Sequence, residues 1–204
     1  MAYLSDIEIA QAKSLPHIKI IAQKLKVEKG SLKNLKDIKV YDVVFDYTDV
    51  QIPKFDNEEA FLKDKMDKRE EKKAGDGERF KNSWFDDRPN RYHPKFIESF
   101  NKRFENDAAK VQESTSDYTL KIHSTKIYPG YNVGVVRHSS ELNATLTIYE
   151  TANPNNILFK GSYVDVKGAG AMGYDYDSGY RISECYAKLA KIFAKELKKK
   201  AYKK

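Results

Sequence analysis

The sequence predicts an α+β domain of two layers, with helices packed on one face of an antiparallel sheet of about four strands. Two segments in the second half of the chain alternate apolar and polar residues, as strands with one buried face do, and a third follows the second after a turn. The last segment carries an apolar stripe at helical spacing, which predicts a C-terminal amphipathic helix. One run of helical segments separates the first predicted strand from the others, and this order favours the α+β class.

The composition of the 204-residue chain suits one folded domain, because 40% of its residues are hydrophobic and 12% are aromatic. Its single cysteine, Cys185, excludes a disulfide scaffold and a cysteine-based zinc module. We expect no integral membrane span, since no stretch approaches the roughly 20 apolar residues that a span requires. The first residues also lack the basic and apolar regions of an export signal.

The chain divides into parts of different composition. We expect a helical leader, a single α+β domain and a basic tail, over residues 1–30, 31–199 and 200–204. In the leader, apolar residues at helical spacing predict helix between residues 5 and 25. Residues 26–37 are rich in lysine and contain Gly30, a composition typical of a linker.

The first half of the domain combines one strand with three helices. Residues 38–47 are β-branched or aromatic on both faces, which predicts a covered central strand. A highly charged helix over residues 57–73 begins at Asn57, whose side chain suits a helix cap. Two further helical stretches are expected over about 77–87 and after Pro94, and the second carries an apolar stripe.

The second half of the domain holds the alternating strands and the last helix. The strands are predicted over residues 118–128, 141–151 and 157–166, and the last two form an antiparallel hairpin. A glycine-rich turn leads to a helix over about 179–199. Cys185 falls on the apolar stripe of that helix, so we expect a small buried hydrophobe there and not a nucleophile.

The net charge of +7 arises at the ends of the chain. Residues 188–204 hold eight lysines and one acid, Glu196, which gives 8 − 1 = +7 for this segment alone. A basic tail can bind nucleic acid or an anionic membrane, but lysines also belong at the solvated C-terminal end of a helix. The tail has no aromatic platform on which bases could stack, so nucleic acid is a disfavoured partner.

Motifs that would indicate catalysis are incomplete in this chain. Residues Gly168 to Gly173 match G-x-G-x-x-G, but a dinucleotide site needs a helix that opens inside the motif and a further strand beyond it. The four histidines lie far apart in the sequence and form no ligand-like pair. An enzyme would require Asp175 and Asp177 to meet a distant partner in a cleft. We therefore expect no catalytic residue, no cofactor and no metal site.

The densest mixed cluster of the chain runs from Trp84 to Tyr92. It combines aromatic, acidic and guanidinium side chains, which together often mark recognition surfaces. The same residues would equally suit a buried aromatic side chain flanked by ion pairs. The candidate binding residues of this cluster are Trp84, Asp87, Arg88, Arg91 and Tyr92.

A second candidate segment precedes the last helix. Its run Asp175-Tyr-Asp177-Ser-Gly179 resembles half of a calcium loop, but the later acidic ligands are missing. A helix cap explains the run better, since Asp177 or Ser178 would accept hydrogen bonds at the positive end of the helix. The candidate binding residues of this segment are Tyr174, Asp175, Asp177 and Arg181.

The start of the chain resembles one known family. In residues 4–25 the pattern SDIEIAQ, followed by Pro, Ile, IA and KL, resembles the extreme N-terminus of formate–tetrahydrofolate ligases. The nucleotide-binding loop and the catalytic body of the ligases have no counterpart here. The resemblance therefore implies at most a helical leader, which would be a fusion or a misassigned start.

A second resemblance rests on longer segments: VVFDYTDV (43–50), SWFDDRPNRYHPKFIESFN (83–101), the strand end 127–130, ETANPNNILFKG (150–161) and AMGYDYDSGYRISECYAKLAK (171–191). Through these segments, residues from about 31 to 199 resemble a family of small, uncharacterised bacterial envelope proteins. Members of that family usually carry an export signal or a lipid-anchor signal. The resemblance implies an α+β fold and a place in the periplasm or the cell envelope, and it transfers no activity.

We therefore expect a non-enzymatic, envelope-associated domain that binds an envelope protein or a small ligand. The alternative is a cytoplasmic domain that binds a polyanion, such as nucleic acid, through its lysine-rich C-terminus. The two hypotheses place the protein in different compartments. The family resemblance implies the envelope, whereas the lack of an export signal fits the cytoplasm.

Overall fold

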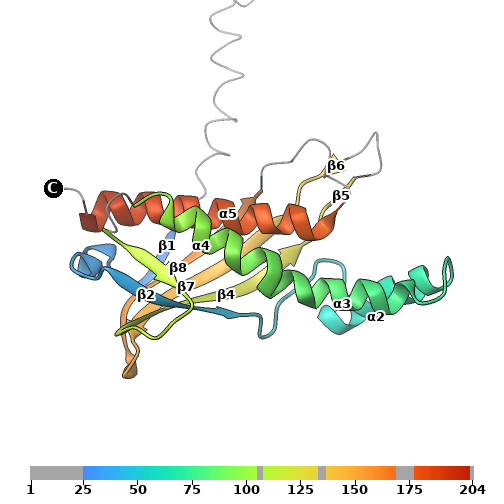
Figure 1. Cartoon of the computed structure of the whole chain (residues 1–204), viewed down its shortest axis with the longest axis horizontal. Coiled ribbons are helices and arrows are strands. Elements are labelled where there is room, and N and C mark those ends of the chain that lie inside the picture. Colours follow the sequence, from blue (N-terminus) through green and yellow to red (C-terminus); the bar gives the residue numbers. More distant parts are fainter. Residues whose placement is uncertain (1–24, 105–107, 133–136, 169–176, 203–204) are drawn as a thin grey trace, which may run out of the picture.

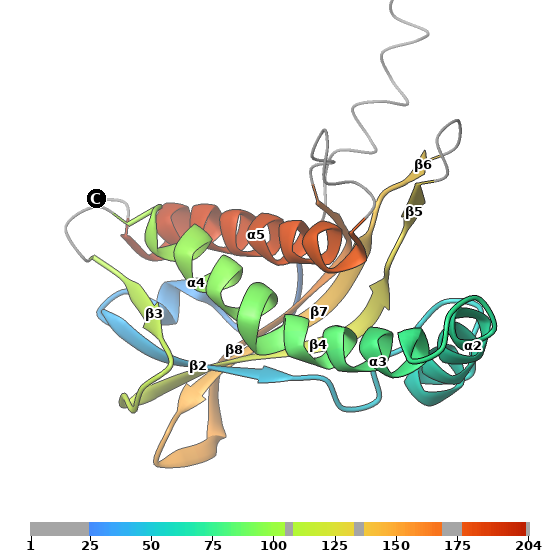
Figure 2. The same ribbon diagram turned by 45° about the vertical axis from the view of Figure 1, so that its right-hand side comes forward.

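The computed structural model describes residues 25–104, 108–132, 137–168 and 177–202. Figure 1 shows a curved sheet with two helices across one face, and a pair of helices that projects beyond the end of the sheet. Among the described residues, no helix lies on the other face of the sheet (Figure 2). The predicted α+β class, with its helices on one face, is confirmed.

The sheet has six strands in the order β1-β8-β7-β4-β2-β3. The strands are β1 (Lys26–Gly30), β2 (Val40–Asp46), β3 (Lys110–Gln112), β4 (Tyr118–Tyr128), β7 (Glu141–Glu150) and β8 (Asn153–Lys167). The pairs β1–β8, β8–β7 and β7–β4 are antiparallel. Strand β2 runs parallel to both of its neighbours, β4 and β3. A separate two-stranded ribbon joins β5 (Tyr131–Asn132) to β6 (Arg137–His138).

The prediction of about four antiparallel strands is therefore wrong in number and in direction. The two missed strands, β1 and β3, are short edge strands. All five residues of β1 are exposed, so its sequence has no alternation that could reveal it. The parallel direction of β2 follows from the helices that return the chain to the same end of the sheet, as a crossover does.

The helices are α2 (Glu58–Glu70), α3 (Asp76–Asp87), α4 (His93–Asn101) and α5 (Ser178–Leu197), with the shorter turns η1 (Leu32–Leu35), η2 (Arg88–Tyr92) and η4 (Lys198–Tyr202). Helix α2 begins at Asn57, whose side chain accepts the backbone N–H of Ala60 at 2.8 Å, so the predicted cap is confirmed. Helices α2 and α3 form a hairpin, and α3, η2 and α4 follow one another as one long bent rod (Figure 2).

The core lies between the sheet and the pair α4–α5. The predicted apolar stripe of α5 is confirmed: Cys185, Leu189 and Phe193 are fully buried. The thiol of Cys185 lies 3.2 Å from the carbonyl of Ser140, and burial raises its pKa to about 12. Such a thiol is a packing group at neutral pH.

The segment expected as a linker, residues 26–37, instead forms β1 and η1. β1 pairs with residues 159–162 of β8. Gly30 ends it with φ at +67°, and a Cβ there would lie 2.0 Å from the carbonyl oxygen of Leu158. The last five residues of the expected leader thus belong to the sheet, while residues 1–24 lie outside the described residues.

Candidate functional site

A pocket of about 360 Å³ opens at the end of the sheet that carries the α2–α3 hairpin, and we call it the hairpin pocket. Four parts of the chain enclose it: the segment 52–55, the hairpin, the end of β4, and the first turn of α5. The side chains and backbone that line it belong to Ile52, Pro53, Lys54, Phe55, Phe61, Lys65, Arg69, Phe80, Tyr128, Pro129, Gly130, Tyr131, Ser178 and Arg181.

Aromatic rings form one wall of the hairpin pocket. The ring of Phe61 contacts Phe55 edge-on, with centroids 5.3 Å apart, and lies 6.1 Å from Phe80. Phe61 also packs at 4.8 Å against the buried Trp84. Such edge-on contacts hold the rings in place, so the wall is preformed.

Cations lie on this aromatic wall. The Nζ of Lys65 is 5.5 Å from the centroid of Phe55, and the guanidinium of Arg69 is 4.0 Å from that of Phe80. Phe61, Lys65 and Arg69 are spaced by four residues, which places them on one face of α2. Burial lowers the pKa of Arg69, but an arginine at this depth stays charged. Its guanidinium donates to the carbonyl of Lys65 and pairs with no carboxylate among the described residues.

A tight turn between β4 and β5 shapes the opposite side. Arg181 is 7% exposed, and its guanidinium donates to the carbonyl oxygens of Pro129 at 3.0 Å and Gly130 at 3.4 Å. The hydroxyl of Ser140 also donates to Pro129. Gly130 has φ at +65°, and a Cβ there would lie 2.3 Å from the carbonyl of His138. Only glycine fits this turn without moving the backbone.

The charge of the hairpin pocket has one sign. Lys54, Lys65, Arg69 and Arg181 line it, and no carboxylate belongs to its described lining. Rings and cations together form a concave site with an apolar wall and a positive potential, which attracts anions. A second cavity of about 320 Å³ shares Arg69, Phe80 and Ser178 with it but is bordered by Asp76, Asp87 and Asp177.

The expected cluster from Trp84 to Tyr92 lies mainly inside the structure. Trp84 is 3% exposed, and its Nε1 donates to Glu58 at 2.7 Å. Arg88 pairs with the same oxygen, and its guanidinium covers the ring of Tyr47 at 4.2 Å. Tyr92 is 1% exposed and stacks on Tyr186 at 5.2 Å. These contacts tie α3 and η2 to α2, to α5 and to Tyr47, which directly follows β2.

The two candidate segments, which the sequence left separate, are joined through Arg91. Arg91 donates to Asp87 at 3.0 Å and also pairs with Asp177. Asp177 caps α5 by accepting the N–H groups of Gly179 and Tyr180, which confirms the capping prediction.

Asp87 and Asp177, the two carboxylates that pair with Arg91, have pKa values shifted in opposite directions. Burial raises the pKa of Asp87. Burial also acts to raise the pKa of Asp177, but the hydrogen bond from Arg91 and the backbone N–H groups outweigh it, so this pKa is lowered. The bridge therefore keeps Asp177 ionised where it neutralises the positive end of α5. Tyr174 and Asp175 lie outside the described residues.

A partly buried polar network surrounds His93, and the spacing of the histidines in the sequence did not predict it. The Nε2 of His93 lies 3.1 Å from the hydroxyl of Tyr47, and its Nδ1 lies 3.2 Å from Glu113. The hydroxyl of Tyr47 also meets that of Tyr186, which hydrogen-bonds to Ser124 at 2.6 Å. Burial lowers the pKa of His93. The network joins β2 and β4 to α4 and α5.

The aromatic and cationic lining of the hairpin pocket was also missed, apart from Arg181. The spacing of Phe61, Lys65 and Arg69 was the available signal, but a charged helix with few apolar residues indicates a solvated face just as well. Within the described residues, no three His, Cys, Asp or Glu side chains gather as a metal ion would need. No helix there combines the length and the apolar character that crossing a membrane requires. No family model, curated protein or solved structure matches this chain.

Proposed function

We propose that this chain is a non-enzymatic binding domain whose hairpin pocket holds a small anion with an apolar, ring-sized body. The observation that carries the proposal is the combination of three phenylalanine rings with cations and no carboxylate in the described lining. Rings favour an apolar body, and the guanidinium of Arg69, which pairs with no carboxylate among the described residues, favours an acid.

Arg69 is the group that would contact the anion most directly. Its guanidinium is held flat on Phe80, and carbonyl contact with Lys65 leaves further N–H donors for a ligand. An arginine stacked on a ring presents a fixed fork that suits a carboxylate or a phosphate. The pocket volume, about 360 Å³, lies in the range of small-molecule sites.

The test is a calorimetric titration of the full chain with naphthoate and with naphthylmethanol, which keeps the rings and lacks the charge. We expect naphthoate to bind and the alcohol to bind at least tenfold more weakly. Arg69→Gln should lower naphthoate affinity about tenfold or more, the scale for losing a charged hydrogen bond. Lys68→Gln is the matched control, because Lys68 is on the same helix, pairs with Asp64 and does not line the pocket.

Two results would overturn this proposal. Equal binding of the acid and the alcohol would show that the cations do not select the ligand. An equal loss in Arg69→Gln and Lys68→Gln would show that the anion binds elsewhere on the hairpin.

The location of the domain in the cell envelope, which the family resemblance implies, is part of the same proposal. It is supported by that resemblance alone. Intact mass and fractionation of the untagged protein from its native source provide the test. A soluble cytosolic chain with residues 1–24 intact would refute the envelope location and leave the pocket proposal standing.

A further inference from the structure

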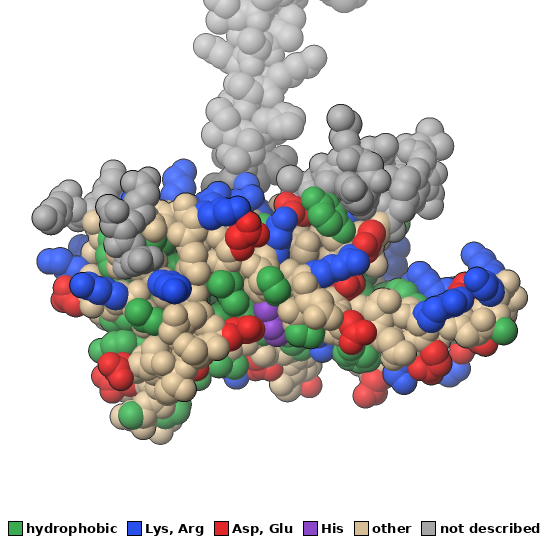
Figure 3. All heavy atoms as spheres, in the orientation of Figure 1, with side chains coloured by type: hydrophobic (Ala, Val, Ile, Leu, Met, Phe, Trp, Pro, Cys, Tyr) green, Lys and Arg blue, Asp and Glu red, His purple; other side chains and the backbone are tan. Residues whose placement is uncertain are grey.

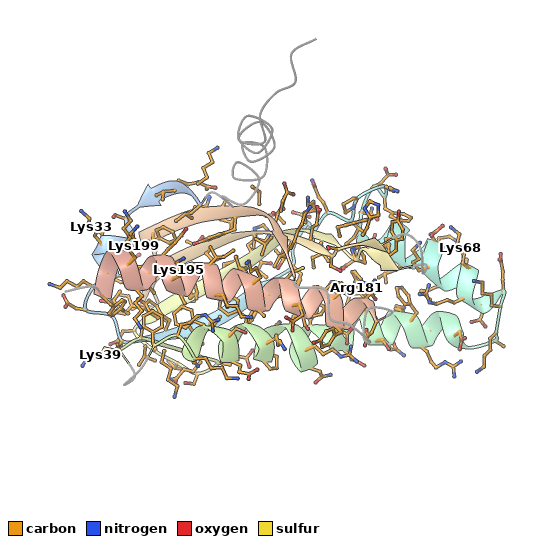
Figure 4. All side chains as sticks on the ribbon, turned by 90° about the horizontal axis from the view of Figure 1, so that it is seen from above. Lys33, Lys39, Lys68, Arg181, Lys195 and Lys199 are labelled. Atoms are coloured by element: carbon orange, nitrogen blue, oxygen red, sulfur yellow. The ribbon has the colours of Figure 1, made fainter. Side chains whose placement is uncertain are left out.

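Eight exposed lysines gather at the end of the molecule opposite the α2–α3 hairpin, and we call this region the lysine end. Figure 4 shows Lys33, Lys39, Lys195 and Lys199 at this end, with Lys68 and Arg181 towards the other. The lysine end consists of Lys33, Lys36, Lys39, Lys110, Lys195, Lys198, Lys199 and Lys200. The described segments that carry them, 31–39, 110–112 and 195–202, hold only two acids, Asp37 and Glu196.

The described contacts fix these segments against one another. The hydroxyl of Tyr202 donates to the carbonyls of Leu35, at 3.1 Å, and Ile38, which ties the end of α5 to η1. The backbone N–H of Lys110 donates to the carbonyl of Lys39 at 2.7 Å, which ties β3 to the start of β2. The lysines therefore keep a set arrangement on a folded surface.

The lysine end differs from the rest of the molecule in its pairing. Every lysine of α2, β4 and β8 forms an ion pair with a carboxylate. Acidic and basic side chains accordingly lie together over the hairpin in Figure 3. None of the eight lysines pairs with a carboxylate among the described residues, and Glu196 accepts its hydrogen bond from Tyr163. A helix C-terminus explains lysines in α5 and η4, but it does not explain those of η1, β3 and the start of β2.

We propose that the lysine end is a docking surface for an anionic phospholipid bilayer. Lysines that approach such a surface bind its lipid phosphates through charge alone. The large exposed apolar side chains of the described residues are Val27, Val44, Phe85, Tyr131 and Val164, and none belongs to the lysine-end segments. Docking would therefore be electrostatic and sensitive to salt.

The side chains at this end favour a bilayer over a nucleic acid. Among the aromatic residues beside the lysines, Phe104 is 6% exposed and the hydroxyl of Tyr202 is engaged with the backbone. Tyr118, which lines a cavity with Lys39, is half-buried. None of these described rings offers bases a fully open face on which to stack. This inference does not depend on the hairpin pocket.

The test is co-sedimentation of the full chain with vesicles of phosphatidylglycerol and phosphatidylcholine, and with vesicles of phosphatidylcholine alone. We expect binding only to the anionic vesicles, with a steep fall as salt rises. The triple variant Lys33→Gln, Lys36→Gln, Lys39→Gln should lower the partition coefficient about 100-fold, because each lysine near the membrane raises it about fivefold. The control variant Lys63→Gln, Lys68→Gln, Lys121→Gln removes the same charge from paired lysines and should change it much less.

Three results would overturn the proposal. Equal losses in the two triple variants would show that net charge alone binds the vesicles. Absence of binding to anionic vesicles at low salt would show that no such surface exists. Tighter binding to a duplex oligonucleotide than to the vesicles at the same salt would assign the lysine end to nucleic acid.

Discussion

The hairpin pocket and the lysine end are both cationic, but they hold their cations in different ways. In the pocket, Lys65 and Arg69 lie on aromatic rings and are half-buried. At the lysine end, the lysine side chains are exposed and pair with no carboxylate among the described residues. Charges away from bulk water interact more strongly and are screened less by salt. The number of cations is thus a poor guide to a selective site, and their surroundings decide whether one small anion or a broad anionic surface is favoured.

The largest expected effect lies at the hairpin, where one carboxylate serves two buried donors. Glu58→Ala leaves Arg88 and the Nε1 of Trp84 without their partner, which should lower the free energy of unfolding by about 3 kcal/mol. Denaturant unfolding measures the loss. Glu59→Ala removes the same charge from the same helical turn at an exposed position and serves as the control. Equal losses in both variants would mean that Glu58 acts only through the helix dipole.

A smaller effect is expected at the turn that Arg181 holds. Gly130→Ala forces an alanine to a positive φ, which costs about 1–2 kcal/mol before any clash with His138 is counted. The turn lines the hairpin pocket, so naphthoate affinity should fall together with stability. Vesicle binding by the folded protein should stay unchanged, because the lysine end is remote. Loss of both activities in a folded variant would contradict the separation of the two regions.

The region between the two ends should respond to pH. Burial lowers the pKa of His93 below its ordinary value of about 6.5, so the folded chain binds its proton less tightly than the unfolded chain does. The contribution of His93 to stability is complete above about pH 6.5 and is lost as the pH falls through the folded pKa. His93→Gln should flatten this part of the curve of unfolding free energy against pH. An unchanged slope would show that other groups govern it.

The smallest effect on stability is expected at the lysine end. The triple variant of Lys33, Lys36 and Lys39 should change the free energy of unfolding by no more than about 0.5 kcal/mol, because these exposed side chains pair with no carboxylate in the described part. Thermal and denaturant unfolding check this. A clear stabilisation would sharpen the comparison, since it would measure the repulsion that the clustered lysines exert on one another.

The elements that could be predicted from the sequence are those in which the spacing of apolar residues alone shows which face is buried. The stripe of α5 and the alternation of β4, β7 and β8 each depend on residues within one element. The edge strands β1 and β3 have no buried pattern of that kind, and the direction of β2 depends on the path of the whole chain. For these, the determining contacts are with distant strands.

The candidate site was predicted only in part for a related reason. Trp84, Arg88 and Tyr92 stood out by residue type, but a buried ion pair and a recognition surface use the same residue types. The hairpin pocket forms where segment 52–55, α2 and α3 meet the turn after β4, and nothing in any one segment indicates that meeting. Asp177 was the exception, because a helix cap is a local motif and its partners are two and three residues away.

Helix α5 contributes to both regions: its first turn supplies Ser178 and Arg181 to the pocket, and its last turns supply lysines to the other end. Its 20 residues make a rod of about 30 Å. A domain docked through its lysines would thus hold a pocket ligand about 30 Å from the lipid phosphates, a distance comparable with the hydrocarbon thickness of a bilayer. At this distance from the membrane, the pocket suits a ligand that arrives through the aqueous phase, since a lipid still inserted in the bilayer could not reach it.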